Sequence, residues 1–91
     1  MAATTLIVRH QVEDYAAWRS VYDSVESLRD QHGCVDATVM TAANDTRDVF
    51  VLHRFPTLEQ AQAFAGSAEL KDAMGRAGEA GPPRIEIAVE V

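Results

Sequence analysis

The sequence has little cysteine and few basic residues, and both shortages narrow the classes of protein it can encode. Cys34 is the single cysteine, so no disulfide can form within the chain, as is typical of reduced, cytoplasmic proteins. Eight Lys and Arg residues stand against fourteen Asp and Glu, which gives a formal net charge of −6. Because nucleic acids and anionic membrane surfaces bind basic faces, we expect neither of them as a partner.

Long apolar runs and nucleotide- or metal-binding motifs are also missing. The longest apolar stretches span a few residues, far short of the roughly 20 residues needed to cross a membrane. The N-terminus carries no charged leader ahead of an apolar run, so no signal peptide is expected. Without a Gly-x-Gly-x-x-Gly, P-loop, His-Glu-x-x-His or Cys-x-x-Cys motif, we expect no nucleotide cofactor and no bound metal.

The remaining composition is that of one small globular domain covering residues 1–91. Hydrophobic residues make up 47% of the chain, which is enough to form a core and too many for a disordered protein. Alternating apolar and polar residues predict four strands, over 5–12, 35–42, 48–55 and 84–91. A polar turn at 44–47 is expected to join the two middle strands into a hairpin.

Helical periodicity follows the first and third predicted strands. Apolar residues at spacings of three and four predict a helix over 15–31, with Asp14 as its N-cap and Gly33 as its stop. A second helix is expected to begin at a capping box, in which Thr57 and Gln60 satisfy each other's backbone donors. It runs to near residue 66, and a short helical continuation covers about 67–76.

This order predicts an α+β, ferredoxin-like βαββαβ fold, with two helices on one face of a four-stranded antiparallel sheet. The other face should carry Ile7, Phe50 and Leu52, which are too apolar to leave in water as one patch. We therefore expect a homodimer in which two sheets pack face to face and form a closed dimeric α/β barrel. Arg9 and Arg54 would lie at that interface and pair with Glu86 or Glu90 of a neighbouring strand.

Three segments resemble the dimeric α/β-barrel superfamily of antibiotic biosynthesis monooxygenases, which also includes haem-degrading monooxygenases and proteins labelled as cyclases. They are Asp14-Tyr15-x-x-Trp18-Arg19-x-x-Tyr22-Asp23, the strand Val49–Phe55, and Thr57–Ala61 leading to Ser67–Lys71. The resemblance covers nearly the whole chain and implies the same dimeric barrel.

The chain also departs from the catalytic members of that superfamily. His53 takes the place of their strand glutamate, and Phe64 takes the place of a histidine on the second helix. The first strand lacks the asparagine that haem-degrading members use. Haem degradation is therefore disfavoured, and the usual acid–base group is missing or replaced.

His10 and His53 are the candidate catalytic residues, because imidazole exchanges protons near neutral pH. Both lie near the C-terminal ends of antiparallel neighbouring strands, so we expect them at opposite ends of the sheet and not at a joint metal site. The alternative for each is a partly buried, hydrogen-bonded strand residue. His32 is expected at the C-terminal end of the first helix, and Cys34 is expected to be structural.

Four aromatic residues are the candidate substrate-binding residues. Trp18 and Tyr22 are four positions apart and should stack on one face of the first helix, where they could wall a pocket or simply pack in the core. Tyr15 would line the mouth of the pocket, and Phe64 would contact the substrate from the second helix. The expected ligand is a small apolar or aromatic molecule.

Three functions remain open on this pocket. The first is a cofactor-independent monooxygenase acting on an aromatic or polyketide-like substrate, with a histidine as base in a dry cavity. The second is a cyclase or isomerase that works through an enolate with a histidine base. The third is a dimeric ligand-binding module without activity, which the missing helical histidine favours over the first.

Overall fold

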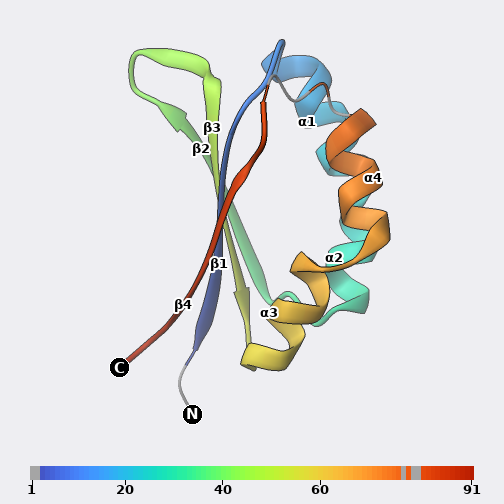
Figure 1. Cartoon of the computed structure of the whole chain (residues 1–91), viewed down its shortest axis with the longest axis vertical. Helices are drawn as coiled ribbons and strands as arrows, with labels where there is room; N and C mark the ends of the chain where they lie inside the picture. The colour runs from blue at the N-terminus through green and yellow to red at the C-terminus, as the bar shows by residue number, and fades with distance from the viewer. Residues whose placement is uncertain (1–2, 77, 79–80) are drawn as a thin grey trace.

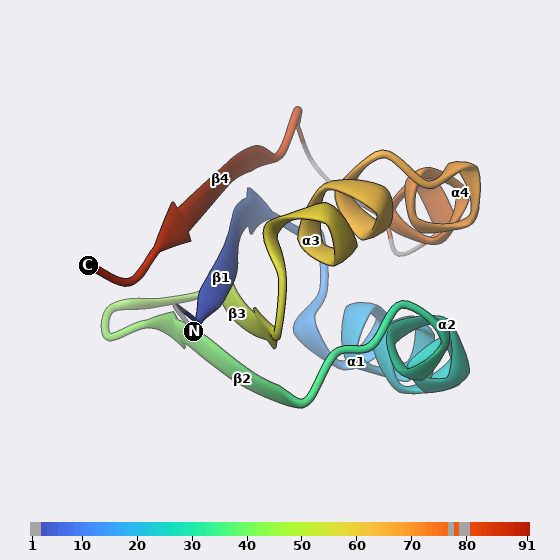
Figure 2. The same cartoon turned by 90° about the horizontal axis from the view of Figure 1, so that it is seen from below.

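The computed structural model describes residues 3–76, 78 and 81–91 and shows one antiparallel sheet with all described helices on one of its faces (Figures 1 and 2). The strands are β1 (Thr4–Gln11), β2 (Asp36–Ala42), β3 (Asp45–Phe55) and β4 (Arg84–Val89), in the order β2-β3-β1-β4. The helices are α1 (Tyr15–Ser24), α2 (Glu26–Gln31), α3 (Leu58–Ala65) and α4 (Ala68–Arg76). The predicted α+β, ferredoxin-like fold is confirmed, and each predicted helical region forms two helices.

Strand β1 lies at the centre of the sheet and pairs with both β3 and β4. Its residues alternate as the sequence predicts: Leu6, Val8 and His10 are buried on the helix side. Ile7 and Arg9 alternate with them and therefore point to the opposite, open face. Because side chains in a strand alternate with period two, this phase decides which residues of all four strands meet the helices.

The predicted helix over 15–31 is wrong as a single element, because it breaks at Val25, where the backbone leaves the helical region (φ −108°, ψ 23°). The carbonyl of Tyr22 accepts hydrogen bonds from the Val25 N–H (3.3 Å) and from the buried guanidinium of Arg29 (2.8 Å). The Ser24 hydroxyl also donates back to the carbonyl of Val21, at 2.6 Å. Such side-chain bonds to helix carbonyls compete with the helical hydrogen bonds and bend or end a helix.

Gly33 ends the second segment, α2, as the sequence predicts, and His32 is its C-cap. Gly33 adopts φ +82°, a left-handed conformation that a residue with a Cβ atom seldom takes. Its N–H donates to the carbonyl of Asp30, and the Cys34 N–H donates to that of Arg29, each at 3.0 Å. This pair of bonds is the Schellman motif, which satisfies the carbonyls at a helix C-terminus.

The N-terminal caps are found where the sequence places them. The Asp14 carboxylate accepts from the Ala17 N–H at 2.8 Å, and the Thr57 hydroxyl accepts from the Gln60 N–H at 3.2 Å. The return contact of the capping box differs from the expectation, since the Gln60 amide oxygen accepts from the Thr57 hydroxyl. The polar turn is also shorter than predicted, because β3 already begins at Asp45 and pairs it with Ala42.

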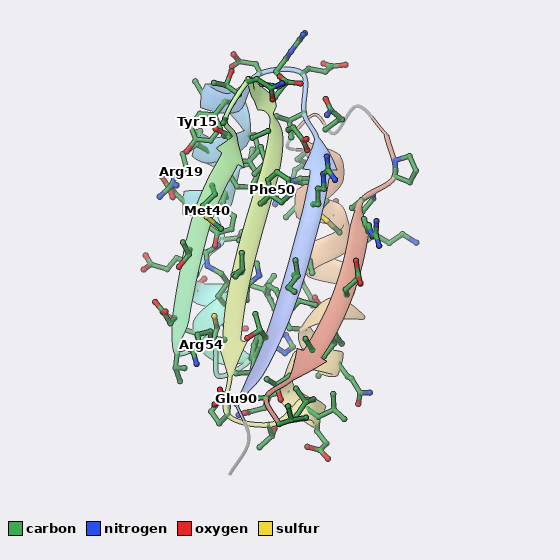
Figure 3. The ribbon with its side chains drawn as sticks, turned by 90° about the vertical axis from the view of Figure 1, so that its left-hand side faces the viewer. Tyr15, Arg19, Met40, Phe50, Arg54 and Glu90 are labelled. Carbon is green, nitrogen blue, oxygen red and sulfur yellow. The ribbon has the colours of Figure 1, made fainter. Side chains whose placement is uncertain are left out.

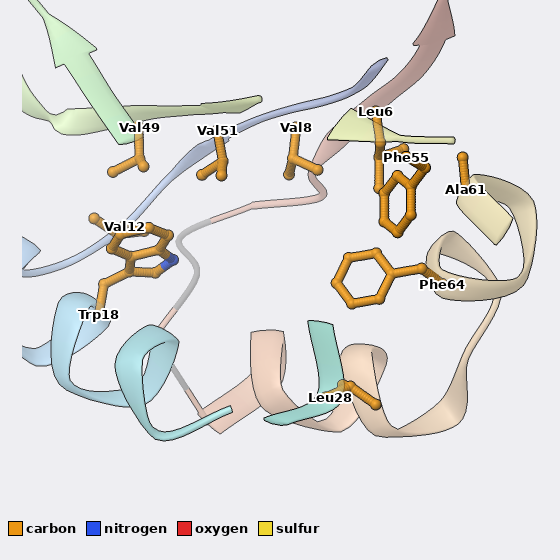
Figure 4. Packing of buried hydrophobic residues seen from close by; sticks show 10 residues of the cluster. All are labelled: Leu6, Val8, Val12, Trp18, Leu28, Val49, Val51, Phe55, Ala61 and Phe64. Atoms are coloured by element: carbon orange, nitrogen blue, oxygen red, sulfur yellow. The ribbon is translucent and has the colours of Figure 1, made fainter. Parts of the chain in front are cut away.

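The hydrophobic core fills the space between the sheet and the helices (Figure 4). Trp18 and Val12 lie together at one end of the cluster, and Phe55 and Phe64 lie together at the other. Val8 and Val51 extend from the sheet between these two groups. Leu6, Val49 and Ala61 are fully buried as well.

The open face of the sheet carries the predicted apolar residues (Figure 3). Ile7, Phe50 and Leu52 are half-buried there, and Met40 of β2 is 45% exposed. No described helix of the chain covers them, because all four helices lie on the other face. This face therefore carries a group of apolar side chains that no described helix covers, next to charged side chains such as Arg9 and Arg54.

The ion pairs on the open face differ from the expectation. Arg9 makes two hydrogen bonds to Asp48 of the same chain, at 2.8 and 3.1 Å, and its guanidinium lies 4.8 Å from the centre of the Phe50 ring. Arg9 lowers the pKa of the Asp48 carboxyl, mainly through these hydrogen bonds. Glu86 pairs with Arg84 of its own strand at 2.7 Å. The predicted pairing of Arg9 with Glu86 is thus wrong within the chain.

Replacing Gly33 with alanine should lower the free energy of unfolding by about 1–2 kcal/mol, because a Cβ atom in the left-handed region meets its own backbone. The new Cβ would also lie 2.5 Å from Nε2 of Gln60, which would have to move. Urea denaturation measures the change. Gly75→Ala is the matched control: nothing lies within 4 Å of that Cβ, so stability should be equal or higher. Equal losses in both variants would contradict this assignment.

Candidate functional site

A partly open cavity of about 40 Å³ lies between the sheet and the helices. Its sheet side is formed by Val8, His10, Val51 and His53. Trp18 and Tyr22 of α1 form another wall, and the remaining sides come from α2, α3 and α4, where the residues are Arg29, Phe64, Leu70, Ala73 and Met74. The cavity is almost entirely apolar, so the few polar atoms that reach it determine what it can do.

Both predicted histidines are buried on the helix-covered face of the sheet, with 4% of His10 and 3% of His53 exposed. In the register of the sheet, His53 lies opposite Leu6, and His10 lies four residues further along β1, opposite Val49. Four residues of a strand span about 13 Å, so the histidines do not touch, as the sequence predicts. They nevertheless line the same cavity, which the sequence does not predict.

The two histidines are connected by the aromatic residues of α1. The ring of His10 meets the edge of Trp18 at 5.7 Å between ring centres, and Trp18 stacks on Tyr22 at 4.9 Å. The Tyr22 hydroxyl oxygen then lies 3.2 Å from Nε2 of His53, which is a hydrogen-bonding distance. Residues four apart on a helix lie on the same face, so Trp18 and Tyr22 stack into one aromatic wall. His10 lies at the Trp18 end of this wall, and His53 lies at the Tyr22 end.

His53 is held in its neutral form. Burial, together with the positive charge of Arg29, lowers the pKa of His53 to about 4. Its Nε2 contacts Tyr22, while its Nδ1 is buried and has no hydrogen-bond partner among the described residues. At neutral pH this imidazole is a weak base, because a useful general base has a pKa near the working pH.

Arg29 is the site residue that the sequence reading missed. It is only 8% exposed, and its guanidinium lies 3.9 Å from the centre of the Tyr22 ring while it donates to the carbonyl of the same residue. This cation–π contact fixes the tyrosine from one side. A signal was available, because the three- and four-residue spacing of Tyr15, Trp18, Tyr22 and Val25 continues to position 29.

The other predicted residues divide between the cavity and its surroundings. Phe64 lines the cavity and packs against His53 at 5.3 Å and Phe55 at 5.6 Å. Tyr15 does not line it, contrary to the expectation: it packs on Trp18 at 5.9 Å and lies beside Arg19, whose guanidinium donates to its hydroxyl (Figure 3). Tyr15 is the first residue of α1, one turn before Trp18, and the lining begins with Trp18 on this helix.

Cys34 shows no sign of an activated thiol. Burial raises the pKa of the Cys34 thiol, and its sulfur donates to the carbonyl of Asp36 at 3.3 Å. A reactive cysteine would instead have a lowered pKa. Across residues 3–76, 78 and 81–91, no group of three or more His, Cys, Asp or Glu side chains is arranged to hold a metal ion. In the same part of the chain, no helix is long and apolar enough to cross a membrane.

Comparison with known proteins defines the class of fold. No family model matches the sequence, and no curated protein sequence does either. Among solved structures, a protein provisionally named antibiotic biosynthesis monooxygenase from Bordetella bronchiseptica has a TM-score of 0.83 at 14% identity, over 100% of this chain and 99% of that one. The predicted resemblance in fold is confirmed.

Two further structures show the range of this likeness. SnoaB, a cofactor-independent oxygenase from Streptomyces nogalater, has a TM-score of 0.74 at 11% identity, over 100% of this chain and 93% of that one. NE2512, a protein of unknown function from Nitrosomonas europaea, has a TM-score of 0.79 at 20% identity, over 100% and 91%. The chain therefore has the fold of the antibiotic biosynthesis monooxygenase structures.

Removing His53 should make the protein less sensitive to acid. The unfolded chain binds a proton at this residue near pH 6.5, and the folded chain only near pH 4. Between these two values of pH, protonation favours the unfolded chain. The free energy of unfolding is therefore unaffected above pH 6.5 and falls by roughly 3 kcal/mol in all as the pH is lowered to 4.

Urea denaturation at pH 7 and pH 4 measures this loss in the wild type and in His53→Leu. The variant should lose about 3 kcal/mol less than the wild type between the two values of pH. His32→Gln, at the half-buried cap of α2, is the control and should lose as much as the wild type. An equal loss in wild type and His53→Leu would show that His53 is not buried as a neutral group.

Proposed function

We propose that this protein is a small-molecule enzyme of the cofactor-independent monooxygenase type and that the cavity is its substrate site. One observation carries the proposal: two buried histidines and the stacked pair Trp18–Tyr22 line one apolar cavity. A dry cavity with a proton acceptor suits a reaction through a reactive carbanion, which water would quench. The likeness in fold to SnoaB, a cofactor-independent oxygenase, supports the same reading.

The reaction would need no external reductant. A base removes a proton from a phenol or from a carbon next to a carbonyl, and the resulting anion gives its electrons to dioxygen. One oxygen atom forms a new bond to a ring carbon. That carbon then loses its hydrogen and the O–O bond breaks, so the second oxygen leaves as water with the two hydrogens of the substrate, and the phenol becomes a quinone. His10 is the candidate base, because His53 with its pKa of about 4 is a poor one at neutral pH.

The size of the cavity limits what can enter the chain as it stands. A cavity of about 150 Å³ accommodates benzene, whereas this one measures about 40 Å³. An aromatic substrate therefore requires part of the wall to move. The flexible side chains of Leu70 and Met74 on α4 are the candidates, because α4 lies farther from the sheet than α3 does (Figure 2).

A ligand-binding module without activity is the second candidate function. The small volume of the cavity favours it, and so does Phe64, which stands where catalytic relatives carry a histidine. The requirement for a base separates the two candidates, since binding alone needs none.

His10→Gln should lower kcat for oxygen-dependent conversion of a phenol by at least 10²-fold, the usual contribution of a general base. Oxygen uptake with a panel of naphthols, and chromatography of the products, provide the measurement. His32→Gln, which removes a histidine that does not itself line the cavity, is the control and should retain the wild-type rate. Binding of naphthol without oxygen uptake in the wild type would favour the binding module, and product formed without oxygen would favour an isomerase or cyclase.

We also propose that the protein is a homodimer in which two open sheet faces pack together. Ile7, Phe50 and Leu52 are half-buried, and Met40 lies beside them. In a monomer these apolar side chains would be exposed to water. A second copy presents the same apolar surface and can bury it through a two-fold interface. The resemblance of the sequence to dimeric α/β barrels supports this arrangement.

Leu52→Asp should shift the protein from dimer to monomer, because a charge at the centre of the paired faces would be buried without a partner. Sedimentation velocity at micromolar concentration measures the assembly, and circular dichroism checks that the variant is folded. Gln62→Asp, on the exposed side of α3, adds the same charge and should remain a dimer. A wild-type protein that sediments only as a monomer would refute the proposed dimer.

A further inference from the structure

We propose that Tyr22 fixes His53 as a neutral imidazole with its hydrogen on Nδ1, so that His53 acts in the cavity as a hydrogen-bond donor to an oxygen of the ligand. The inference rests on the proposed function in one respect, namely that the cavity is the ligand site. It assigns His53 a role opposite to that of a base. It also assigns Tyr22 the role of a positioning residue, because Tyr22 acts through the histidine.

The contact between the two side chains allows two arrangements of hydrogen. The Tyr22 hydroxyl can donate to a bare Nε2 of His53, or a protonated Nε2 can donate to the hydroxyl oxygen, since 3.2 Å fits both. In the second arrangement the tyrosine hydrogen would need another acceptor. In the first arrangement the phenol donates and the imidazole nitrogen accepts. This direction is favoured because a phenol is a stronger acid than the N–H of a neutral imidazole.

The surroundings of the pair favour the first arrangement. Arg29 lies over the Tyr22 ring at 3.9 Å, and its positive charge makes the phenol a better donor while it disfavours a second proton on His53. Burial raises the pKa of Tyr22, so the phenol keeps its hydrogen at neutral pH and has it to donate. With Nε2 occupied as an acceptor, the hydrogen of the neutral ring belongs on Nδ1.

This hydrogen then needs an acceptor that the described chain does not supply. Nδ1 of His53 is buried and has no hydrogen-bond partner among the described residues. An unsatisfied buried donor destabilises the folded protein, and a ligand oxygen that enters the cavity and accepts from Nδ1 would remove that cost. His53 is one of the residues that line the cavity, and almost all of the cavity surface is apolar. The ligand class that fits is therefore an apolar body with one buried carbonyl or enolate oxygen.

Such a donor has a specific use in chemistry that passes through an enolate or phenolate. A neutral, fixed N–H in a water-poor site stabilises negative charge as it develops on oxygen. Proton removal then falls to another group, and His10 lines the same cavity at the other end of the aromatic wall. The two histidines would divide the work between a base and an oxyanion donor.

Nitrogen-15 NMR of histidine-labelled protein at pH 7 tests the assignment, because protonated and bare ring nitrogens have well-separated chemical shifts. The wild type should show His53 with a protonated Nδ1 and a bare Nε2. In Tyr22→Phe the signals should shift toward the form protonated at Nε2. Tyr15→Phe also removes a tyrosine hydroxyl, but outside the cavity lining, and should leave the His53 signals unchanged.

A wild-type His53 protonated at Nε2 would overturn the proposal, and this result does not depend on whether Tyr22→Phe folds. An unchanged Nδ1–H form in a folded Tyr22→Phe would overturn the role of Tyr22.

Acetone and its hydrocarbon isostere 2-methylpropene then probe the ligand side. Acetone should shift the Nδ1 signal of His53, and 2-methylpropene should not. If the tautomer is as proposed but acetone causes no shift, the donor role toward a ligand is wrong, and the fault lies with the cavity as a ligand site.

Discussion

The pairing of β1 with both of its neighbours is the constraint on which the rest of the structure depends. It places every second residue of β1 against the helices and the others on the open face. A slip of one residue would move His10 to the open face and put Arg9 into the core. The burial of Leu6 and Val8 disfavours that slip, because a shift by one residue would expose both of them on the open face. The apolar core and the site are therefore fixed by the same register.

Much of the fold follows from local rules that the sequence displays directly. Alternation predicts the strands, and Asp14, Thr57 and Gly33 mark helix ends through bonds to atoms only a few residues away. The break at Val25 is different, because it depends on the side chain of Arg29 returning to the carbonyl of Tyr22. That return requires both helices to be packed already, so periodicity alone cannot show it. The pairing of Arg9 with Asp48 could not be predicted either, because it depends on the register between β1 and β3.

The lining of the cavity follows the same division. His10, His53, Trp18, Tyr22 and Phe64 line it because each lies in phase with the core, and phase is visible in the sequence. The bond between Tyr22 and His53 was not predictable, since it depends on how far along β3 helix α1 is placed. The volume was not predictable either, because it is the small difference between the space the backbone encloses and the side chains that fill it.

The broken helix has a further consequence for how the protein can change. Tyr22 supplies the carbonyl at which α1 ends, and its ring contributes to the wall of the cavity. A sequence that restored one regular helix would satisfy local helix preference, but it would change the direction of the chain between Tyr22 and Arg29, and with it the contacts of Arg29 to the carbonyl and ring of Tyr22. The break at Val25 is thus coupled to the position of the Tyr22 phenol. A substitution that straightens this segment would therefore be felt at the wall of the cavity as well as in the helix.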